Sequence, residues 1–427
     1  MINQGEEKIS DFSLKDACIY DAKLQGDEFV GLKYENGKVS VQFPLGYTKS
    51  EDEKEIRRDI LNLISVLASF SDRKDSFIHA SSAKDYSNQF PIHAYMYLIS
   101  DFMNKGYYSE SQALYKKSSS GKINWSRTIK QIRPQLIDDS VIYLDFIRKR
   151  TNHNENELIS QIHKYLVYES FSKIGWIFSS FMPQKGALAF NANLFRAVVK
   201  SKISQTFDEK ELMLFQNMLL IIDYKDSTDE AKNFYFGTEH FESVWEGLID
   251  SVFGQDDKEK FYPKCHWFIE GKGQANLNND IYKKYSLRPD TIMITNRGKE
   301  NQKIFILDSK YYKYGLSKIP YDLPGTGSIV KQFAYAEFIE REPEKIPHDV
   351  KKVLDKKAIY NAFILPGQHD SPLQYFGYSH ADYKNEHEKS YSKIYGFTYD
   401  IKTLMYKHIP KDKQMIDELA KLITTSL

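Results

Sequence analysis

Two apolar runs near residue 300 constrain the fold of this chain more than any other feature. The first run occupies residues 288–294 and the second occupies residues 304–312, with a polar stretch between them. Ile304 to Leu307 is unbroken by any polar side chain, which is typical of a strand buried on both faces of a sheet. The two runs therefore predict a β-hairpin inside a covered sheet, and hence a mixed α/β (α+β) fold.

Charged residues stand at the ends of these two strands. Asp290 precedes the first strand, and Asp308 and Lys310 end the second. Side chains alternate between the faces of a strand, so Asp308 and Lys310 share one face and Ser309 points to the other. Pairing of the strands would bring Asp290 to the face of Asp308. Charges at the exit of a buried strand are costly unless something offsets them.

Two neighbouring carboxylates suit Mg²⁺, whose coordination is then completed by water and by substrate phosphate oxygens. We therefore expect Asp290 and Asp308 to bind Mg²⁺, for which Mn²⁺ can substitute, with the Ser309 carbonyl as a further oxygen ligand. Lys310 would orient or deprotonate the attacking water. This arrangement predicts phosphodiester hydrolysis. The plainer interpretation is a Pro-Asp turn and strand-end charges that are solvated or paired.

The composition limits the classes of protein that this chain can be. Its 59 basic and 58 acidic side chains nearly cancel, so contacts to nucleic acid must come from local basic patches. Two cysteines cannot build a disulfide framework or a zinc site. The chain starts without an apolar leader and has no apolar run of about 18 residues. We expect a cytoplasmic protein that makes no contact with membranes.

The order of predicted elements divides the chain at a polar break near residues 223–230. Residues 1–225 would form an N-terminal region that recognises DNA or docks a partner, with a small β start and then mostly helices. Residues 226–427 would form the nuclease domain. Its expected order is α-β-β-β-α-β: helix 239–253, strand 266–270, the hairpin, helix 328–340 and strand 358–365.

A basic segment in the N-terminal region surrounds a single tryptophan. Lys122, Trp125, Arg127 and Lys130 lie close together in the sequence, and basic charges beside an aromatic ring can grip the phosphates of a duplex. The alternative is a solvated loop that enters a helix, with Trp125 as its apolar anchor.

These motifs resemble the PD-(D/E)xK nuclease superfamily and, within it, the LlaJI-type restriction endonuclease family. The likeness spans most of the chain. It rests on Phe43-Pro44-Leu45-Gly46-Tyr47, Ile56-Arg57-Arg58-Asp59-Ile60, Gly121-Lys122-Ile123-Asn124-Trp125, Leu287-Arg288-Pro289-Asp290, Ile306-Leu307-Asp308-Ser309-Lys310-Tyr311-Tyr312, the 323–332 segment and Ile394-Tyr395-Gly396-Phe397.

The resemblance implies a PD-(D/E)xK core in which Asp290 and Asp308 bind the metal and Lys310 is the catalytic lysine. Many members carry Glu where this chain has Asp308, and the shorter side chain puts the metal geometry in question. An acid on the first core helix often completes such a site. Glu246 is our candidate, and Glu242, one turn earlier, competes with it.

Three further residues follow from the resemblance. Glu270, at the end of a predicted strand, is a further candidate ligand. Gln332 and Tyr335, three residues apart on the helix after the hairpin, resemble residues that steady DNA in related nucleases. The alternative is a helix face that packs Tyr335 and exposes Gln332.

The implied function is a Mg²⁺-dependent, type II-like restriction endonuclease that cuts double-stranded DNA in a bacterial restriction–modification system for phage defence. A cognate DNA methyltransferase would be its partner, and cleavage of both strands would need a homodimer or two sequential nicks. One alternative is an McrC-like subunit that cuts only with a separate AAA+ GTPase. Another is a non-catalytic DNA-binding protein with a nuclease fold. No Gly-Lys-Ser/Thr phosphate loop is present, so the chain itself is not expected to hydrolyse NTP.

Overall fold

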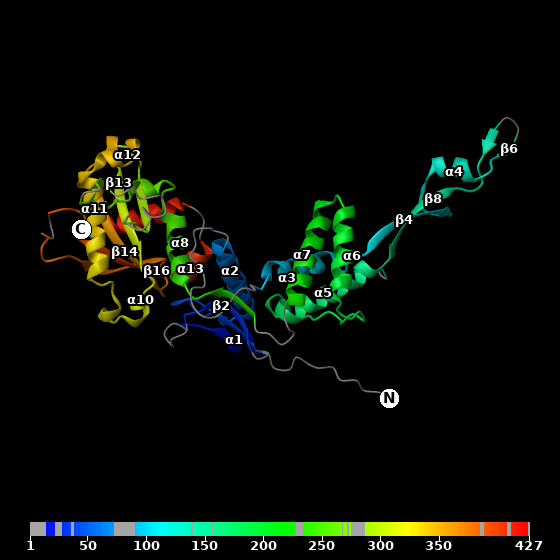
Figure 1. Cartoon of the computed structure of the whole chain (residues 1–427), viewed down its shortest axis with the longest axis horizontal. Helices are drawn as coiled ribbons and strands as arrows, with labels where there is room; N and C mark the ends of the chain where they lie inside the picture. The colour runs from blue at the N-terminus through cyan, green and yellow to red at the C-terminus, as the bar shows by residue number, and fades with distance from the viewer. Residues whose placement is uncertain are drawn as a thin grey trace. The chain divides into compact units, whose positions relative to one another are not determined.

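The computed structural model describes residues 14–21, 28–35, 38–71, 90–137, 140–154, 157–227, 234–266, 268–270, 273–274, 287–384, 388–407 and 411–425. The chain forms two compact units (Figure 1). Unit 1 combines Met1–Tyr86 with Tyr235–Leu427, and unit 2 is Ser87–Phe234.

This division differs from the predicted one at residues 225/226, because the first part of the chain packs with the last. The predicted boundary lies close to the second junction between the units. The strand that follows that junction, β9 (Phe234–Thr238), returns to β2 (Val30–Glu35) in a four-stranded sheet of order β1-β3-β2-β9. Gly31 permits this approach, because its φ is 141° and a Cβ there would lie 2.2 Å from the Phe236 carbonyl oxygen.

The remaining elements of the N-terminal part of unit 1 are short. The β2 and β3 strands pair antiparallel, with Glu35 opposite Lys38, as expected for a hairpin; its predicted Asn36-Gly37 turn lies outside the described residues. The other elements are α1 (Leu14–Ala17), β1 (Cys18–Ile19), β3 (Lys38–Gln42) and α2 (Glu53–Ser71).

A five-stranded mixed sheet of order β12-β13-β14-β16-β15 forms the centre of unit 1. The β13, β14 and β16 strands run parallel, whereas β12 and β15 are antiparallel to their neighbours. Every residue of β14 and β16 is buried, as in a sheet covered on both faces. The strands are β12 (Thr291–Thr295), β13 (Lys303–Ser309), β14 (Ile359–Gly367), β15 (Leu373–Ser379) and β16 (Ile394–Asp400).

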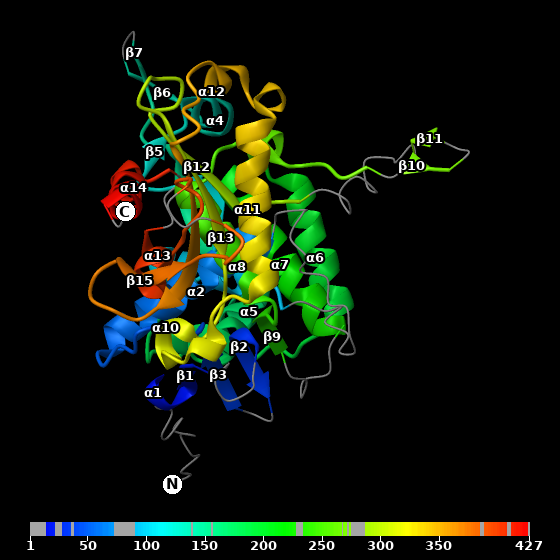
Figure 2. The ribbon, with the colours of Figure 1, turned by 90° about the vertical axis from the view of Figure 1, so that its left-hand side faces the viewer.

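Two long helices cover this sheet from opposite sides, α8 (Phe241–Phe253) and α11 (Thr326–Arg341) (Figures 1 and 2). The core on the α11 side joins Phe333 and Ile339 to alternate strand residues such as Ile304 and Ile306. Shorter elements complete the unit: η3 (Lys258–Phe261), α10 (Tyr314–Ser317), η4 (Pro320–Asp322), η5 (Pro343–Lys345), α12 (His348–Lys352), α13 (Ile401–Tyr406) and α14 (Lys413–Thr425).

One predicted strand does not join this sheet. Residues 266–270 contribute only β10 (Phe268–Ile269), which pairs with β11 (Gly273–Gln274) in a separate two-stranded ribbon. The order around the site is therefore α8-β12-β13-α11-β14, one central strand fewer than expected. The predicted helices 239–253 and 328–340, the hairpin and the strand 358–365 are confirmed within a few residues.

Unit 2 combines a helical bundle with a β-rich segment. The predicted helical content is confirmed for the bundle, but residues 110–154 mostly form strands. Their pairing partners, β4 and β8, are far apart in the sequence, which local periodicity does not reveal. The elements are α3 (Ile92–Lys105), β4 (Glu110–Lys117), β5 (Lys122–Ile123), α4 (Trp125–Gln131), β6 (Gln135–Ile137), β7 (Ser140–Ile142), β8 (Ile147–Asn154), α5 (Leu158–Ile174), η2 (Gly175–Ile177), α6 (Ala192–Gln205) and α7 (Glu209–Ser227).

Among the helices of the described residues, none has the length and apolar character needed to cross a bilayer.

Candidate active site

The register of the β12/β13 hairpin places the two predicted acids opposite each other. Thr291 pairs with Leu307, so the next pair along the strands is Asp290 with Asp308. Asp308 continues the alternation of Ile304 and Ile306, whose side chains pack with α11. The hairpin thus carries both carboxylates to the end of β13 where the parallel strands have their carboxyl termini.

Lys310 lies between these two carboxylates. Its Nζ atom donates to Asp308 Oδ1 at 2.8 Å and is 4.0 Å from Asp290 Oδ2. The backbone N–H of Ser309 donates to the same Oδ2 atom at 2.8 Å. Asp290, Asp308 and Lys310 therefore converge as the strand pattern predicts.

Burial and like charge make this cluster electrostatically unfavourable. Burial raises the pKa of Asp290 well above its usual range, and the carboxylates of Asp308 and Glu246 raise it further. Burial alone would lower the pKa of Lys310, but Asp308, Asp290 and Glu246 outweigh it and the pKa is raised. Lys310 is therefore protonated near neutral pH and offsets only part of the negative charge.

Glu246 on α8 faces the same space as Lys310. Burial raises the pKa of Glu246, and the charges of Asp308 and Glu242 add to the increase, against the opposing effect of Lys310. Glu242 also lines this space, but its carboxylate pairs with His240 at 3.1 Å and is half-exposed. Glu270 lies exposed on the β10–β11 ribbon and does not line this space.

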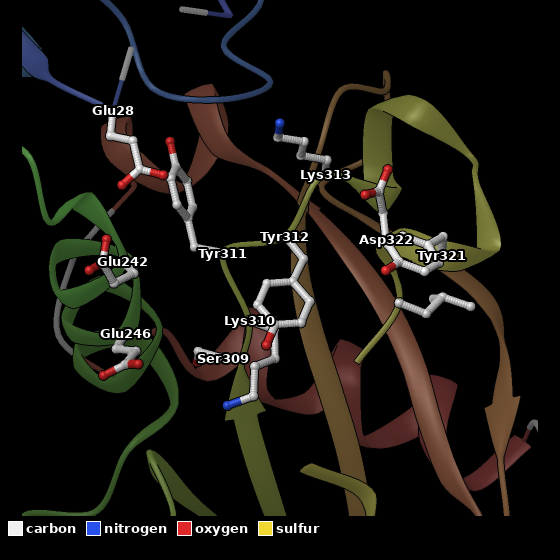
Figure 3. Close-up of a pocket in the computed structure, with 11 residues that line it drawn as sticks. Glu28, Glu242, Glu246, Ser309, Lys310, Tyr311, Tyr312, Lys313, Tyr321 and Asp322 are labelled. Carbon is white, nitrogen blue, oxygen red and sulfur yellow. The ribbon is translucent and has the colours of Figure 1, made fainter. Parts of the chain in front are cut away.

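Glu242, Glu246 and Lys310 border a cavity of about 520 Å³, and neither Asp290 nor Asp308 is part of its lining (Figure 3). Figure 3 shows Glu242 and Glu246 along one wall, Tyr321 on the opposite side and Lys310 between them. The lining residues are Glu28, Glu242, Glu246, Ser309, Lys310, Tyr311, Tyr312, Lys313, Tyr321, Asp322 and Leu323.

Two supporting residues escaped the analysis of the sequence. Lys258 Nζ donates to the backbone carbonyl of Asp290 at 2.6 Å and pairs with Asp250 at 2.8 Å. Lys258 therefore fixes the backbone from which the Asp290 carboxylate projects. Lys258 and Asp250 come from η3 and α8, and their sequence shows no pattern that links them to the hairpin.

Gln332 and Tyr335 lie on the buried face of α11, which packs on the sheet. The Tyr335 hydroxyl donates to the Arg288 carbonyl at 3.2 Å. Burial raises the pKa of Tyr335, and Asp308 and Asp290 raise it further. Gln332 is fully buried, and neither its side-chain oxygen nor its nitrogen has a hydrogen-bond partner among the described residues. Both residues are buried, so the alternative in which Gln332 is exposed is wrong. Neither side chain is exposed for the direct contact with DNA that the resemblance implies.

The side chains at the hairpin suit Mg²⁺, which keeps water ligands, better than they suit a metal ion whose ligands all come from the protein. No group of three His, Cys, Asp or Glu side chains within the described ranges is placed to hold a metal ion, so Glu246 does not join Asp290 and Asp308 as a third ligand in the way that the resemblance implies. Mg²⁺ instead binds through one or two carboxylates and keeps water and phosphate ligands. Asp290 and Asp308 provide that number, and a cation beside them would relieve the repulsion that raises the pKa of Asp290.

The predicted DNA-contacting residues of unit 2 cluster on β5 and α4. Lys122, Trp125, Arg127 and Lys130 are all exposed, and Trp125 keeps 54% of its surface in solvent while its ring meets Phe146 edge-on at 5.6 Å. The Arg127 guanidinium lies 4.0 Å from the Tyr115 ring centroid.

The chain matches the model of the LlaJI restriction endonuclease family over residues 29–410. It is similar to the type II restriction enzyme BsuMI component YdjA of Bacillus subtilis (strain 168), with 24% identity over 298 residues, or 64% of this chain. The chain spans 59% of the length of that relative.

A search of solved structures finds a weak likeness to a chain in the half-complex from the tetradecameric assembly of Thermococcus gammatolerans McrB AAA+ hexamers with bound McrC. The TM-score is 0.34 at 14% identity, over 92% of this chain and 83% of that one. A likeness this weak supports no inference about fold or partners. The family match covers most of the sequence, and the chain therefore belongs to the LlaJI restriction endonuclease family.

Proposed function

We propose that this chain is a Mg²⁺-dependent endonuclease that hydrolyses double-stranded DNA in a restriction–modification system, with a PD-(D/E)xK-type active site. The convergence of Asp290, Asp308 and Lys310 at the end of β13 supports the proposal most strongly. Membership of a restriction endonuclease family supports DNA as the substrate.

In this proposal each residue of the cluster has a separate task. Asp290 and Asp308 would hold the cation, with the Ser309 carbonyl as a further oxygen ligand. When bound, Mg²⁺ would acidify water and offset the charge that develops on the phosphate. Lys310, kept protonated by its acidic neighbours, would donate to the scissile phosphate and orient the attacking water.

The predicted residues on α8 and α11 have supporting tasks. Glu246 would order water on the opposite side of the cavity. Tyr335 would hold the backbone before Asp290 through Arg288, and Gln332 beside it has unused hydrogen-bonding groups for ordered water.

We further propose that the enzyme works with a second component. The relative from Bacillus subtilis is named as a component of its restriction enzyme, and the motifs of this chain resemble McrC-like subunits, which act with an AAA+ GTPase. In that case the exposed basic face of β5 and α4 is available to DNA or to the partner. Digestion of phage DNA by the chain alone, and then with the product of a neighbouring NTPase gene, distinguishes these two arrangements.

Cleavage of plasmid DNA tests the nuclease proposal. We expect Mg²⁺-dependent cutting that leaves 5′-phosphate and 3′-hydroxyl ends. Asp308→Asn should cut about 100-fold more slowly or worse, because a metal ligand is lost. Asp370→Asn, at an exposed acid outside the cavity, should cut at the wild-type rate. Equal rates for Asp308→Asn and the wild type would rule the proposal out.

A further inference from the structure

The cavity beside Lys310 has two chemically different walls. One wall, the acidic wall, consists of Glu28, Glu242 and Glu246. The other wall, the aromatic wall, consists of Tyr312, Lys313, Tyr321, Asp322 and Leu323. Figure 3 shows Tyr312 beside Lys310 and Asp322 beside Tyr321. Negative charge on the acidic wall repels phosphate. The aromatic wall carries one acid, Asp322, and one base, Lys313. A DNA strand whose phosphate reaches Lys310 is therefore repelled less along the aromatic wall than along the acidic wall.

The rings on this wall are unusually exposed for residues beside a catalytic cluster. Tyr321 has 96% of its surface in solvent and Tyr312 has 40%. The side chain of Tyr321 makes no hydrogen bond or ring contact within the described part of the chain. Ile319, two residues before it, is also exposed. An aromatic ring left in water at a cavity mouth has its full apolar surface available to a ligand.

The backbone that presents Tyr321 is held in place by its own hydrogen bonds. The Ser317 hydroxyl donates to Asp322 Oδ2 at 2.6 Å, and the Asp322 N–H donates to the Ile319 carbonyl at 3.0 Å. Pro320 opens the short η4 helix and restricts its φ angle. A turn braced in this way loses little conformational entropy when a ligand covers the ring.

Tyr312 is tied just as closely to the catalytic lysine. Its N–H donates to the Lys310 carbonyl at 2.9 Å, so the position of the Tyr312 ring depends on the same turn that presents the ammonium group. The distance from a phosphate at Lys310 to the Tyr312 ring is therefore set by one short segment of backbone, whereas Tyr321 is presented by the separate turn at residues 317–322.

We propose that Tyr321, together with Tyr312, forms a base-stacking subsite for the nucleotide next to the scissile phosphate. An unstacked base of the cleaved strand would lie against the Tyr321 ring while its phosphate contacts Lys310. Stacking on an exposed ring tolerates every base, because each base has a π-face. The subsite would position DNA and contribute little to recognition of sequence. This inference rests on the proposed nuclease function and assigns Tyr321 as a positioning residue.

The test compares three variants of the full chain for binding to a fluorescein-labelled DNA duplex of about thirty base pairs, with Ca²⁺ replacing Mg²⁺. Tyr321→Ala should weaken binding about 5- to 100-fold, the range found when a stacking ring is removed. Tyr321→Phe keeps the ring and should bind like the wild type. Tyr383→Ala, at another exposed tyrosine outside the cavity, is the matched control.

The salt dependence of binding separates stacking from charge. Stacking releases no counterions, so Tyr321→Ala should lower the affinity by the same factor at each salt concentration. Thermal unfolding should be unchanged, because the ring supports no packing.

Two results would overturn the inference in distinguishable ways. Wild-type affinity for Tyr321→Ala, or a loss that Tyr321→Phe fails to restore, removes the stacking subsite and leaves the nuclease proposal intact. A wild-type chain that neither binds the duplex nor cuts DNA, both alone and with the product of the neighbouring NTPase gene, contradicts both.

Discussion

At the residue scale, the charge balance of the site depends on Lys310. Three carboxylates, Asp290, Asp308 and Glu246, act on it, and their combined attraction exceeds the penalty of burial. One ammonium group cannot neutralise three acids, so the cluster keeps an affinity for a second positive charge. A divalent cation would supply that charge, and the phosphate oxygens of a bound substrate would complete its coordination.

Glu246 and Glu242 can be separated by mutation. Glu246→Gln should lower the cleavage rate about 10- to 100-fold, the usual cost of losing a group that supports a metal site, because Glu246 interacts with Lys310 and Asp308. Glu242→Gln should change the rate little, because that carboxylate pairs with His240. Initial rates of plasmid nicking measure both, and a larger loss for Glu242→Gln would reverse the assignment.

At the scale of elements, the hairpin shows what a sequence can predict. The apolar run in β13 fixes the strand, and its alternation fixes which face Asp308 takes. Which side chains of α11 are buried was not predictable in the same way. Its sequence places Gln332 beside Phe333, and only packing on the sheet decides that both are buried. Strand 266–270 was assigned to the sheet wrongly, because local pattern does not identify a pairing partner.

The α5 helix carries a buried histidine that should make unit 2 sensitive to acid. Burial lowers the pKa of His163 from 6.5 to about 4, and the Tyr108 N–H donates to its Nδ1 atom at 3.1 Å. The unfolded chain takes up a proton near pH 6.5 and the folded chain only near pH 4. Stability is therefore complete above pH 6.5 and falls by up to about 3 kcal/mol as the pH drops to 4.

Urea unfolding at a series of pH values measures this effect. His163→Gln has no group that titrates there, so its free energy of unfolding should fall less between pH 7 and pH 4 than that of the wild type. Parallel curves for the two proteins would show that His163 is protonated in the folded chain.

At the scale of the whole molecule, unit 1 is built from both ends of the chain. The polar break at residues 223–230 lies a few residues before the junction that follows Phe234, and the predicted boundary at 225/226 falls within α7 (Glu209–Ser227). The pairing of β9 with β2 and the contact between α2 and α13 join segments far apart in the chain. Such contacts have no signature in local composition, so the membership of residues 1–86 in unit 1 could not be predicted.

Asp59 on α2 tests this discontinuous unit. Its buried carboxylate accepts hydrogen bonds from Lys402 and Tyr406 of the C-terminal part, and from Tyr47 and Ser50. Asp59→Ala should destabilise the protein by about 3–5 kcal/mol, because it leaves a half-buried lysine and three hydroxyl groups without their partner.

Glu53→Ala is the matched control on the same helix, because the Glu53 carboxylate is exposed and pairs with Arg57 at 4.0 Å. Urea unfolding followed by circular dichroism compares the two variants. Equal stability of Asp59→Ala and Glu53→Ala would mean that the N-terminal part does not support the C-terminal part.

Titration calorimetry with Mn²⁺, a cation that can replace Mg²⁺, tests most directly whether Asp290 and Asp308 form one cation site, and it requires neither DNA nor a partner. We predict saturable binding of about one ion per wild-type chain. Asp308→Asn should bind the ion at least ~10-fold more weakly. Identical isotherms for the two proteins, or no heat in the wild type, would contradict the account.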